Sequence, residues 1–271
     1  MNKNFKFFVI PAMILLSFSS CGIEDDGNLN DEDNNQEQLT PVKESDYCAE
    51  KSVTFGETNG VEYVDLDLPS GNLWATMNIG ADENDVCGNY YAWGETSTKN
   101  SFDINNYVFY KDESTDEDEY GEFNDGFTKY VVQDNYHYYG FKKFADNKVT
   151  LDLSDDVAHV TLGGSWRIPT QCDFEELKDN CKMKWTSYQG VQGYKFTASN
   201  GNSIFMPASG NVYYDRVYEY DHTGWYWTST LYGKDSGYAC YFFFTSSSCC
   251  IQHDIKREIG NAIRAVCPVK K

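Results

Sequence analysis

Tyrosine and tryptophan side chains crowd the stretch between residues 213 and 226, and they point to ligand binding. Aromatic rings stack on the apolar faces of sugar rings, and a tyrosine hydroxyl adds a polar contact. The stretch shows no clean alternation of apolar and polar residues, so its rings are open to two interpretations, a binding surface and packing in the core. We predict a ligand-binding surface formed by Tyr213, Tyr214, Tyr218, Tyr220, Trp225 and Tyr226.

Cysteine chemistry is the second candidate, because soft thiolates bind Cu(I). Cys249 and Cys250 are the only close pair among nine cysteines. On a regular strand their side chains would point to opposite faces and would not converge on one ion. The chain has no CxxC pair and only four scattered histidines, which argues against a zinc site. We predict no metal and no cofactor.

Hydrolytic chemistry finds no matching pattern either. The chain has no Gly-x-Ser-x-Gly elbow and no Ser/His/Asp order. Acids are too abundant in the loops to single out a glycosidase pair. An EF-hand loop starting at Asp116 would place its bidentate glutamate at Phe127 and therefore fails. We predict that the protein is not an enzyme.

The formal net charge of −20 is concentrated in two segments. Residues 22–46 hold nine acids against Lys43, a net of −8, and residues 111–125 hold eight acids against Lys111, a net of −7. The remainder carries −20 + 15 = −5. Such a chain lacks the basic face that nucleic acid requires, and an anionic membrane surface would repel it.

The N-terminus has the form of a secretion signal. Lys3 and Lys6 precede a mostly apolar core, Phe7 to Leu16, that is too short to span a bilayer. Phe18-Ser19-Ser20-Cys21 then resembles a bacterial lipobox, although an ordinary cleaved signal with a coincidental cysteine is the alternative. We predict a signal peptide over residues 1–20, lipidation of Cys21, and attachment to the membrane through that lipid.

The residues after Cys21 are similar to the acidic signal that sends Bacteroidetes lipoproteins to the outer face of the outer membrane. Residues 21–47 contain almost no large apolar residue, which predicts a disordered acidic tether. We therefore expect a lipid-anchored protein of the outer membrane, exposed on the cell surface.

An even number of cysteines outside the cytoplasm predicts disulfides. Eight remain after Cys21, and 105 connectivities are open to them. Cys172 and Cys181 cannot pair if one helix carries both, because nine residues would hold them about 13 Å apart. The eight are Cys48, Cys87, Cys172, Cys181, Cys240, Cys249, Cys250 and Cys267.

Residues 163–181 contain more signals of local structure than any other stretch of the chain. Gly163-Gly164 predicts a turn, and Pro169 sets a corner after a short strand. Thr170 is placed to cap a helix, with Asp173 as its partner three residues on. Phe174, Leu177 and Cys181 would then share one helical face. Earlier, Ser154 is placed to cap a short helical turn.

The other elements are predicted to be short strands separated by turns. An α+β domain dominated by antiparallel sheet, with one or two helices, follows from this order. We expect a single domain over residues 48–271, with an irregular acidic insertion at about 96–162. The predicted strands are 61–68, 73–80, 88–95, 194–197, 203–206, 225–230, 238–244, 249–253 and 261–266.

Several different motifs follow one another along the chain in a recognisable order. They include Leu73-Trp74-Ala75-Thr76-Met77-Asn78-Ile79-Gly80, Tyr91-Ala92-Trp93-Gly94-Glu95, Gly163-Gly164-Ser165-Trp166-Arg167-Ile168-Pro169-Thr170, Tyr226-Trp227-Thr228-Ser229 and Ile263-Arg264-Ala265-Val266. Over roughly residues 55–269 this series resembles the Fibrobacter succinogenes major paralogous domain family of Bacteroidetes surface proteins. The resemblance implies a C-type-lectin-like fold, related to the sulfatase-modifying (formylglycine-generating) fold, and no established activity.

Within this resemblance, Trp166, Arg167, Pro169, Trp227 and Arg264 are interpreted as residues that set the fold. Calcium-dependent lectins carry a Glu-Pro-Asn or Gln-Pro-Asp triplet and a Trp-Asn-Asp triplet. Here those neighbourhoods read Met206-Pro207-Ala208 and Trp227-Thr228-Ser229, which lack the oxygens that calcium needs. We expect a binding or adhesion module that recognises glycan or protein without calcium. A structural surface-assembly protein and, less favoured, a formylglycine-generating-type enzyme are the alternatives.

Overall fold

The computed structural model describes residues 55–114, 125–133 and 140–269, all within one compact unit that spans residues 39–271. The predicted signal peptide, Cys21 and the acidic tether lie outside the described residues, as does most of the acidic segment 111–125. In the described ranges, no helix is long and apolar enough to cross a membrane.

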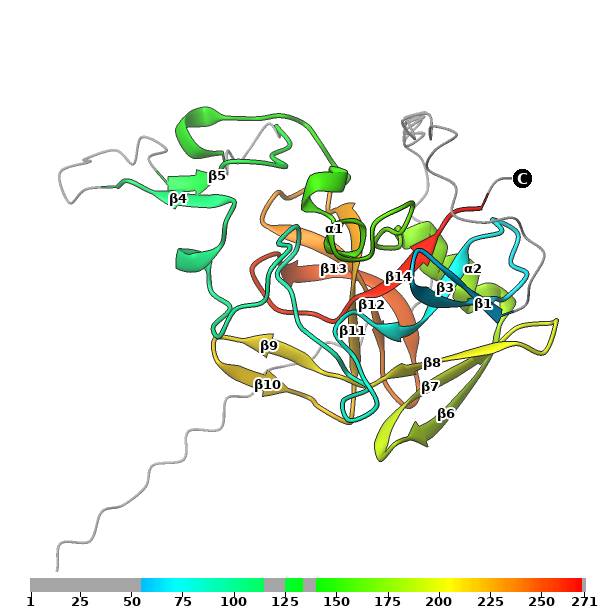
Figure 1. Cartoon of the computed structure of the whole chain (residues 1–271). Coiled ribbons are helices and arrows are strands. Elements are labelled where there is room, and N and C mark those ends of the chain that lie inside the picture. Colours follow the sequence, from blue (N-terminus) through cyan, green and yellow to red (C-terminus); the bar gives the residue numbers. More distant parts are fainter. Residues whose placement is uncertain (1–54, 115–124, 134–139, 270–271) are drawn as a thin grey trace, which may run out of the picture. The chain divides into compact units, whose positions relative to one another are not determined.

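The described chain is an α+β structure of short antiparallel strands (Figure 1). One sheet has the order β1-β2-β3-β14, a second β6-β7-β8 and a third β11-β12-β13, with two-stranded pairs β4-β5 and β9-β10. The strands are β1 Phe55–Thr58, β2 Val61–Asp65, β3 Leu73–Asn78, β4 Tyr110–Asp112, β5 Asp125–Phe127, β6 Lys182–Tyr188, β7 Val191–Thr197, β8 Ser203–Pro207, β9 Asn211–Tyr213, β10 Arg216–Tyr218, β11 Gly224–Leu231, β12 Tyr238–Phe244, β13 Cys249–Lys256 and β14 Arg264–Cys267. The helices are α1 Val157–Leu162 and α2 Gln171–Asn180, with 3-10 turns η2 Ile104–Asn106, η3 Phe141–Lys143 and η4 Leu153–Asp155.

Three pairs of successive predicted strands form hairpins. β2 pairs with β3, β7 with β8, and β12 with β13, all antiparallel. The predicted strand over 88–95 is wrong. Gly88 and Gly94 take positive φ angles there. Its backbone forms an isolated bridge with Asn261 and one hydrogen bond to Arg257, instead of joining a ladder.

The corner at 163–170 docks on the last strand. The backbone of Arg167 exchanges two hydrogen bonds with Val266 of β14. Thr170 and Asp173 form the predicted capping box at the start of α2. Phe174 and Leu177 of that helix are fully buried, and Cys181 packs half-buried beside the same cluster.

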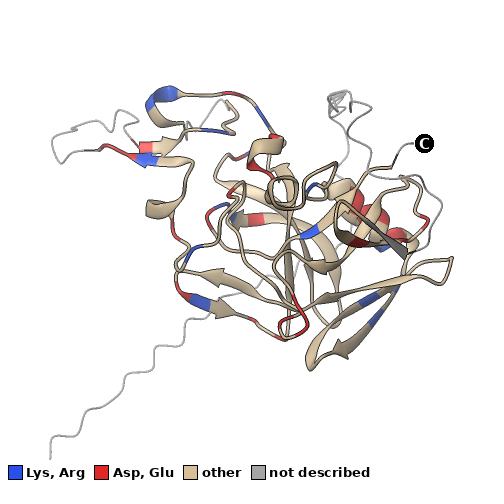
Figure 2. Cartoon of the chain, in the orientation of Figure 1, with Lys and Arg blue, Asp and Glu red and all other residues tan. Residues whose placement is uncertain are grey.

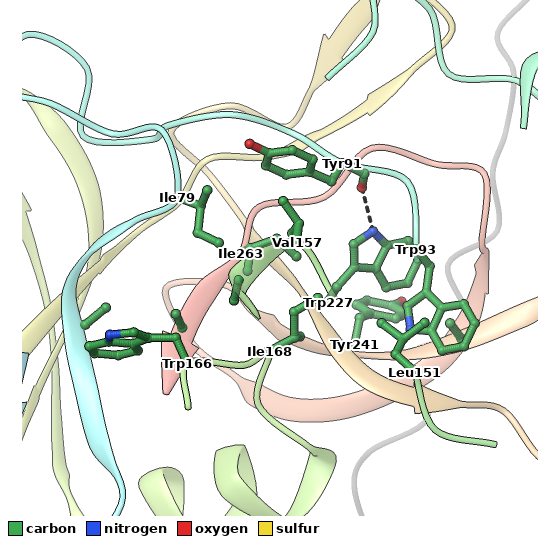
Figure 3. Packing of buried hydrophobic residues seen from close by; sticks show 14 of the residues in the cluster. Ile79, Tyr91, Trp93, Leu151, Val157, Trp166, Ile168, Trp227, Tyr241 and Ile263 are labelled. Carbon is green, nitrogen blue, oxygen red and sulfur yellow. Dashed lines mark hydrogen bonds between the residues drawn. The ribbon is translucent and has the colours of Figure 1, made fainter. Parts of the chain in front are cut away.

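Large aromatic side chains fill the core around this corner (Figure 3). Trp166, Ile168 and Trp227 all lie in one buried cluster. The indole N–H of Trp227 donates to the carbonyl oxygen of Tyr91 at 2.7 Å, and this bond ties the irregular 88–95 segment to β11. Trp227 thereby satisfies a buried carbonyl group as well as filling space.

The helix cap before the corner differs from the prediction. α1 starts at Val157, and its cap is Asp156, whose carboxylate accepts from the backbone N–H of His159. Ser154 lies one turn earlier, in η4. The second oxygen of Asp156 accepts from Ile168 N at 2.8 Å, so this buried carboxylate connects the helix to the corner, a link that the Ser154 hydroxyl does not make.

Asp156 should give the protein a characteristic pH dependence. Burial raises its pKa from 3.8 to about 6, so the folded state holds the proton more tightly than the unfolded state does. The free energy of unfolding should therefore fall by roughly 3 kcal/mol as pH rises from about 4 to about 6, which corresponds to two pKa units. Above pH 6 it should level off. Urea unfolding between pH 4 and pH 8 should show this slope in the native chain and a smaller one in Asp156→Asn. A carboxyl carbon signal of Asp156 that titrates near 3.8 would contradict the account.

Most cysteines among the described residues are not in disulfide bonds. Six of them, Cys87, Cys172, Cys181, Cys240, Cys249 and Cys250, are thiols and not disulfides. Cys267 is disulfide-bonded, and none of these six is its partner. The expected framework of several disulfides is therefore not found among the described cysteines.

Candidate functional site

The tyrosine-rich segment folds as the β9–β10 hairpin (Figure 1), and several of its tyrosine side chains are exposed. Tyr213 and Arg216 pair across the two-residue turn. Five large side chains here are between 37% and 50% exposed, namely Tyr213, Tyr214, Val217, Tyr218 and Tyr220. Several exposed rings on one short hairpin are typical of a binding surface. We call it the tyrosine hairpin.

The base of the tyrosine hairpin is firmly attached to the domain. Val212 exchanges two backbone hydrogen bonds with Gly260, and Tyr214 exchanges two with Phe102. Gly210 lies so close to the end of β10 that a Cβ there would stand 2.1 Å from the carbonyl oxygen of Tyr218. Only glycine fits at that position. The exposed rings are therefore presented on a fixed backbone.

The hairpin also contains unfavourable backbone conformations. Tyr214, Glu219 and Asp221 have φ angles of 53°, 55° and 65°, in the left-handed region that non-glycine residues rarely adopt. Asp221 is held in place by its carboxylate, which accepts from Gln192 N at 2.5 Å. Residues in such conformations persist where the surrounding structure enforces them, and they are concentrated at binding sites.

Two residues of the predicted binding surface do not belong to it. Tyr226 is fully buried, and its hydroxyl donates to Pro207 O and accepts from the Asn78 amide. Trp225 points to the other face of β11, where it is half-buried and stacks on Tyr241 with ring centroids 5.0 Å apart. Neighbouring residues on a strand face opposite sides, so Trp225 and Tyr226 could not both join one surface.

A shallow pocket of about 300 Å³ opens beside the hairpin. It shares Val212 with β9, and its other lining residues come from two irregular segments that follow β3. The aromatic part is formed by Tyr90 and Phe102, and the polar part includes the amides of Asn89 and Asn100. Rings next to amides can hold a ligand that offers both apolar faces and hydroxyl groups.

The cations of this region are already neutralised. Lys99, which also lines the pocket, lies 2.9 Å from the carboxylate of Glu95. Arg216 has its guanidinium 4.0 Å from Asp215. A hydrogen bond with Tyr214 is the main reason that the pKa of Tyr213 rises to about 12, with desolvation and nearby acids adding to it. The site therefore offers neutral phenols and no unpaired cation among its described residues.

The residues interpreted as fold-setting make contacts within the domain. Arg167 forms a salt bridge with Asp173, at 2.7 Å. Arg264 is buried and donates to the side chain of Asn78 and to the carbonyl oxygens of Ala75, Thr76 and Phe205. Burial lowers the pKa of Arg264 to about 10. Trp166 and Trp227 lie in the core, and Pro169 accepts from Ser229 N.

Sequence reasoning missed a second buried arginine. Arg257 donates to the Tyr107 hydroxyl and to three carbonyl oxygens, those of Lys129, Tyr130 and Ser236. Its guanidinium lies within 6 Å of five aromatic rings, which belong to Trp93, Tyr107, Phe109, Phe127 and Tyr130. It holds residues 127–131 against the end of β13.

The remaining chemical candidates are weak at their described positions. Burial raises the pKa of Cys249 to about 12, with the neighbouring Cys250 adding to the effect, so Cys249 is a thiol at neutral pH and a poor nucleophile or ligand. Among the described residues, no group of three or more His, Cys, Asp or Glu side chains is arranged to hold a metal ion. Comparison of the chain with protein-family models, with curated proteins and with solved structures found no match.

Proposed function

We propose that this protein is a non-catalytic binding module that recognises a glycan, without calcium, through the tyrosine hairpin and the pocket beside it. The observation that carries this proposal is the set of exposed tyrosine rings on a firmly attached hairpin. We further propose that the domain has a C-type-lectin-like fold of the major paralogous type. In this proposal, a lipid on Cys21 anchors it to the outer membrane and exposes it on the cell surface.

A saccharide fits the chemistry of this region. Sugar rings offer apolar C–H faces to aromatic side chains and hydroxyl groups to amides. Tyr213 and Tyr214 lie with ring centroids 4.3 Å apart and form one continuous aromatic surface. The amides of Asn89 and Asn100 line the neighbouring pocket. The absence of an unpaired cation among the described residues of the site favours a neutral sugar over an acidic one.

A protein partner on the same surface is the second candidate, and one observation favours it. Val217 is 49% exposed on the same hairpin, and an aliphatic side chain contributes more to a protein interface than to a sugar site. In that case the protein would act as a structural component of a surface assembly.

A glycan array probed with the full chain tests the proposal. Tyr214→Asn removes one ring while tolerating the positive φ angle, and Tyr218→Thr removes another while keeping a residue favoured in strands. Because central aromatic anchors dominate binding energy, each change should weaken binding of a neutral glycan by about tenfold or more. A calcium chelator should have no effect. Phe144→Ala, which alters an exposed ring elsewhere, should bind like the native chain.

Three outcomes count against the proposal. Binding that disappears with the chelator would refute the calcium-independent site. Equal loss in Phe144→Ala would show that the effect is not specific to the hairpin. No glycan signal, together with a protein cross-linked to the hairpin on intact cells, would favour the assembly role.

A further inference from the structure

The outer face of the β6–β7–β8 sheet carries an unusual combination of side chains. Its inner face, which includes Met183 and Trp185, packs on the core. Because side chains alternate, the residues between these point to the opposite, exposed side. Lys184 of β6 lies directly opposite Lys195 of β7, which in turn lies opposite Phe205 of β8. Lys182 lies two residues before Lys184 on the same face.

These three lysines have no acidic partner. None of Lys182, Lys184 and Lys195 forms an ion pair with a described residue, and all three are exposed. Figure 2 shows the basic residues on the β6–β7 hairpin. The chain as a whole is acidic, with a net charge of −20, so a cluster of basic residues is not expected from its average composition.

Protection of a sheet edge explains only part of the cluster. β6 is an edge strand, and lysines on edge strands prevent pairing with other chains. Lys195, however, lies on β7, the central strand of this sheet. Like charges directly opposite each other on neighbouring strands are destabilising. Lys195 therefore places a like charge opposite Lys184, at a cost in stability, without itself protecting an edge.

Two aromatic rings lie beside the lysines. Tyr188, at the end of β6, is 52% exposed, and its ring centroid is 5.6 Å from that of Phe205. The Phe205 ring covers Gly193, where a Cβ would stand 2.8 Å from its tip. Glycine at that position lets the ring lie flat along the sheet. We call Lys182, Lys184, Lys195, Tyr188 and Phe205 the lysine face.

We propose that the lysine face binds an anionic polysaccharide, one with carboxylate or sulfate groups along its chain, at a site separate from the tyrosine hairpin. The lysines offer cations spread over two strands, which suits a repeating anion better than a single small one. The two rings offer stacking surfaces for sugar residues between the charges. The proposal does not depend on the function of the tyrosine hairpin.

Two other polyanions fit less well. Nucleic acid has a higher charge density and would be repelled by the remaining negative charge of the chain. Segments that bind anionic membranes typically carry four to eight basic residues, and such binding needs no aromatic pair beside them. The rings at Tyr188 and Phe205 therefore favour the polysaccharide.

Binding of the full chain to polygalacturonate, with neutral dextran as a control polymer, tests the proposal. The triple variant Lys182→Gln, Lys184→Gln, Lys195→Gln should bind about tenfold more weakly, since three exposed charge contacts are lost. Binding should also weaken as salt is raised. Tyr188→Ala should weaken binding severalfold. Lys234→Gln changes an exposed lysine elsewhere and should bind like the native chain.

The triple variant should unfold at the same or a higher temperature, because a like-charge pair has been removed; this keeps a loss of binding from being mistaken for unfolding. The proposal would be overturned if neither polygalacturonate nor heparin bound the native chain. It would also be overturned if they bound the triple variant as tightly as the native chain. Tighter binding to phosphatidylglycerol vesicles or to single-stranded DNA than to either polysaccharide would overturn it as well. A glycan-array failure at the tyrosine hairpin would leave this result unaffected.

Discussion

Replacing Arg257 with methionine is expected to lower the free energy of unfolding by about 4 kcal/mol. Methionine keeps much of the side-chain length but has no donor. The change would leave the Tyr107 hydroxyl and three buried carbonyl oxygens without their present donor. It would also remove a cation from the five rings that surround it. Urea unfolding, followed by tryptophan fluorescence, measures the loss.

Arg216→Met provides the matched control, because Arg216 is largely exposed and lies no nearer than 4.0 Å to the carboxylate of Asp215. Its effect should stay within about 0.5 kcal/mol. Hydrogen exchange in Arg257→Met should rise first in residues 127–131, which the guanidinium holds in place. A loss below about 1 kcal/mol would mean that these carbonyl groups find other donors, and the anchoring role of Arg257 would then be wrong.

Arg264→Met is expected to have an effect of similar size, about 3 to 4 kcal/mol, for a different reason. Arg264 joins two sheets, since it donates to carbonyls at Ala75 and Thr76 in β3 and at Phe205 in β8. It also orients Asn78, whose amide donates to the Tyr226 hydroxyl. Thermal unfolding and hydrogen exchange at β3 and β8 together measure the change.

Asn78→Ala separates the two contributions of Arg264. It removes the side-chain acceptor of Arg264 and the amide donor to Cys87 O and the Tyr226 hydroxyl, but leaves the three carbonyl contacts of Arg264. Hydrogen exchange at β8 should therefore rise less than in Arg264→Met. If the two variants lose equal stability and Arg264→Met leaves the exchange of β8 unchanged, Arg264 does not connect the sheets. Phe205 would then be held by its strand partners alone.

The parts of the fold that the sequence predicted are those governed by local patterns. Alternation predicted β2, and apolar runs on either side of turn residues predicted the strands of the β7–β8 and β12–β13 hairpins. Cap chemistry predicted α2. β6 was missed, although Met183 and Trp185 alternate with Lys182 and Lys184 as in a half-buried strand. The segment 88–95 was misread because its glycines break the ladder that its aromatic residues favour.

The candidate site was predicted in part, for the same reason. Exposure of the four tyrosines between 213 and 220 agrees with a segment that lacked alternation. The period of β11 could have shown that Trp225 and Tyr226 face opposite sides. Arg257 could not have been found, because it stands between Lys256 and Glu258 and reads as surface charge. Only packing of distant segments places it among buried rings.

Hydroxyl-radical footprinting of the full chain tests the central claim most directly. The chain would be oxidised alone and with the strongest-binding neutral glycan from the array. The account predicts that Tyr213, Tyr214, Tyr218 and Tyr220 become protected, while the exposed Tyr188 and Phe144 react at the same rate in both samples. Equal oxidation of the hairpin tyrosines with and without saturating glycan, or protection confined to other residues, would contradict the claim that the tyrosine hairpin is the binding site.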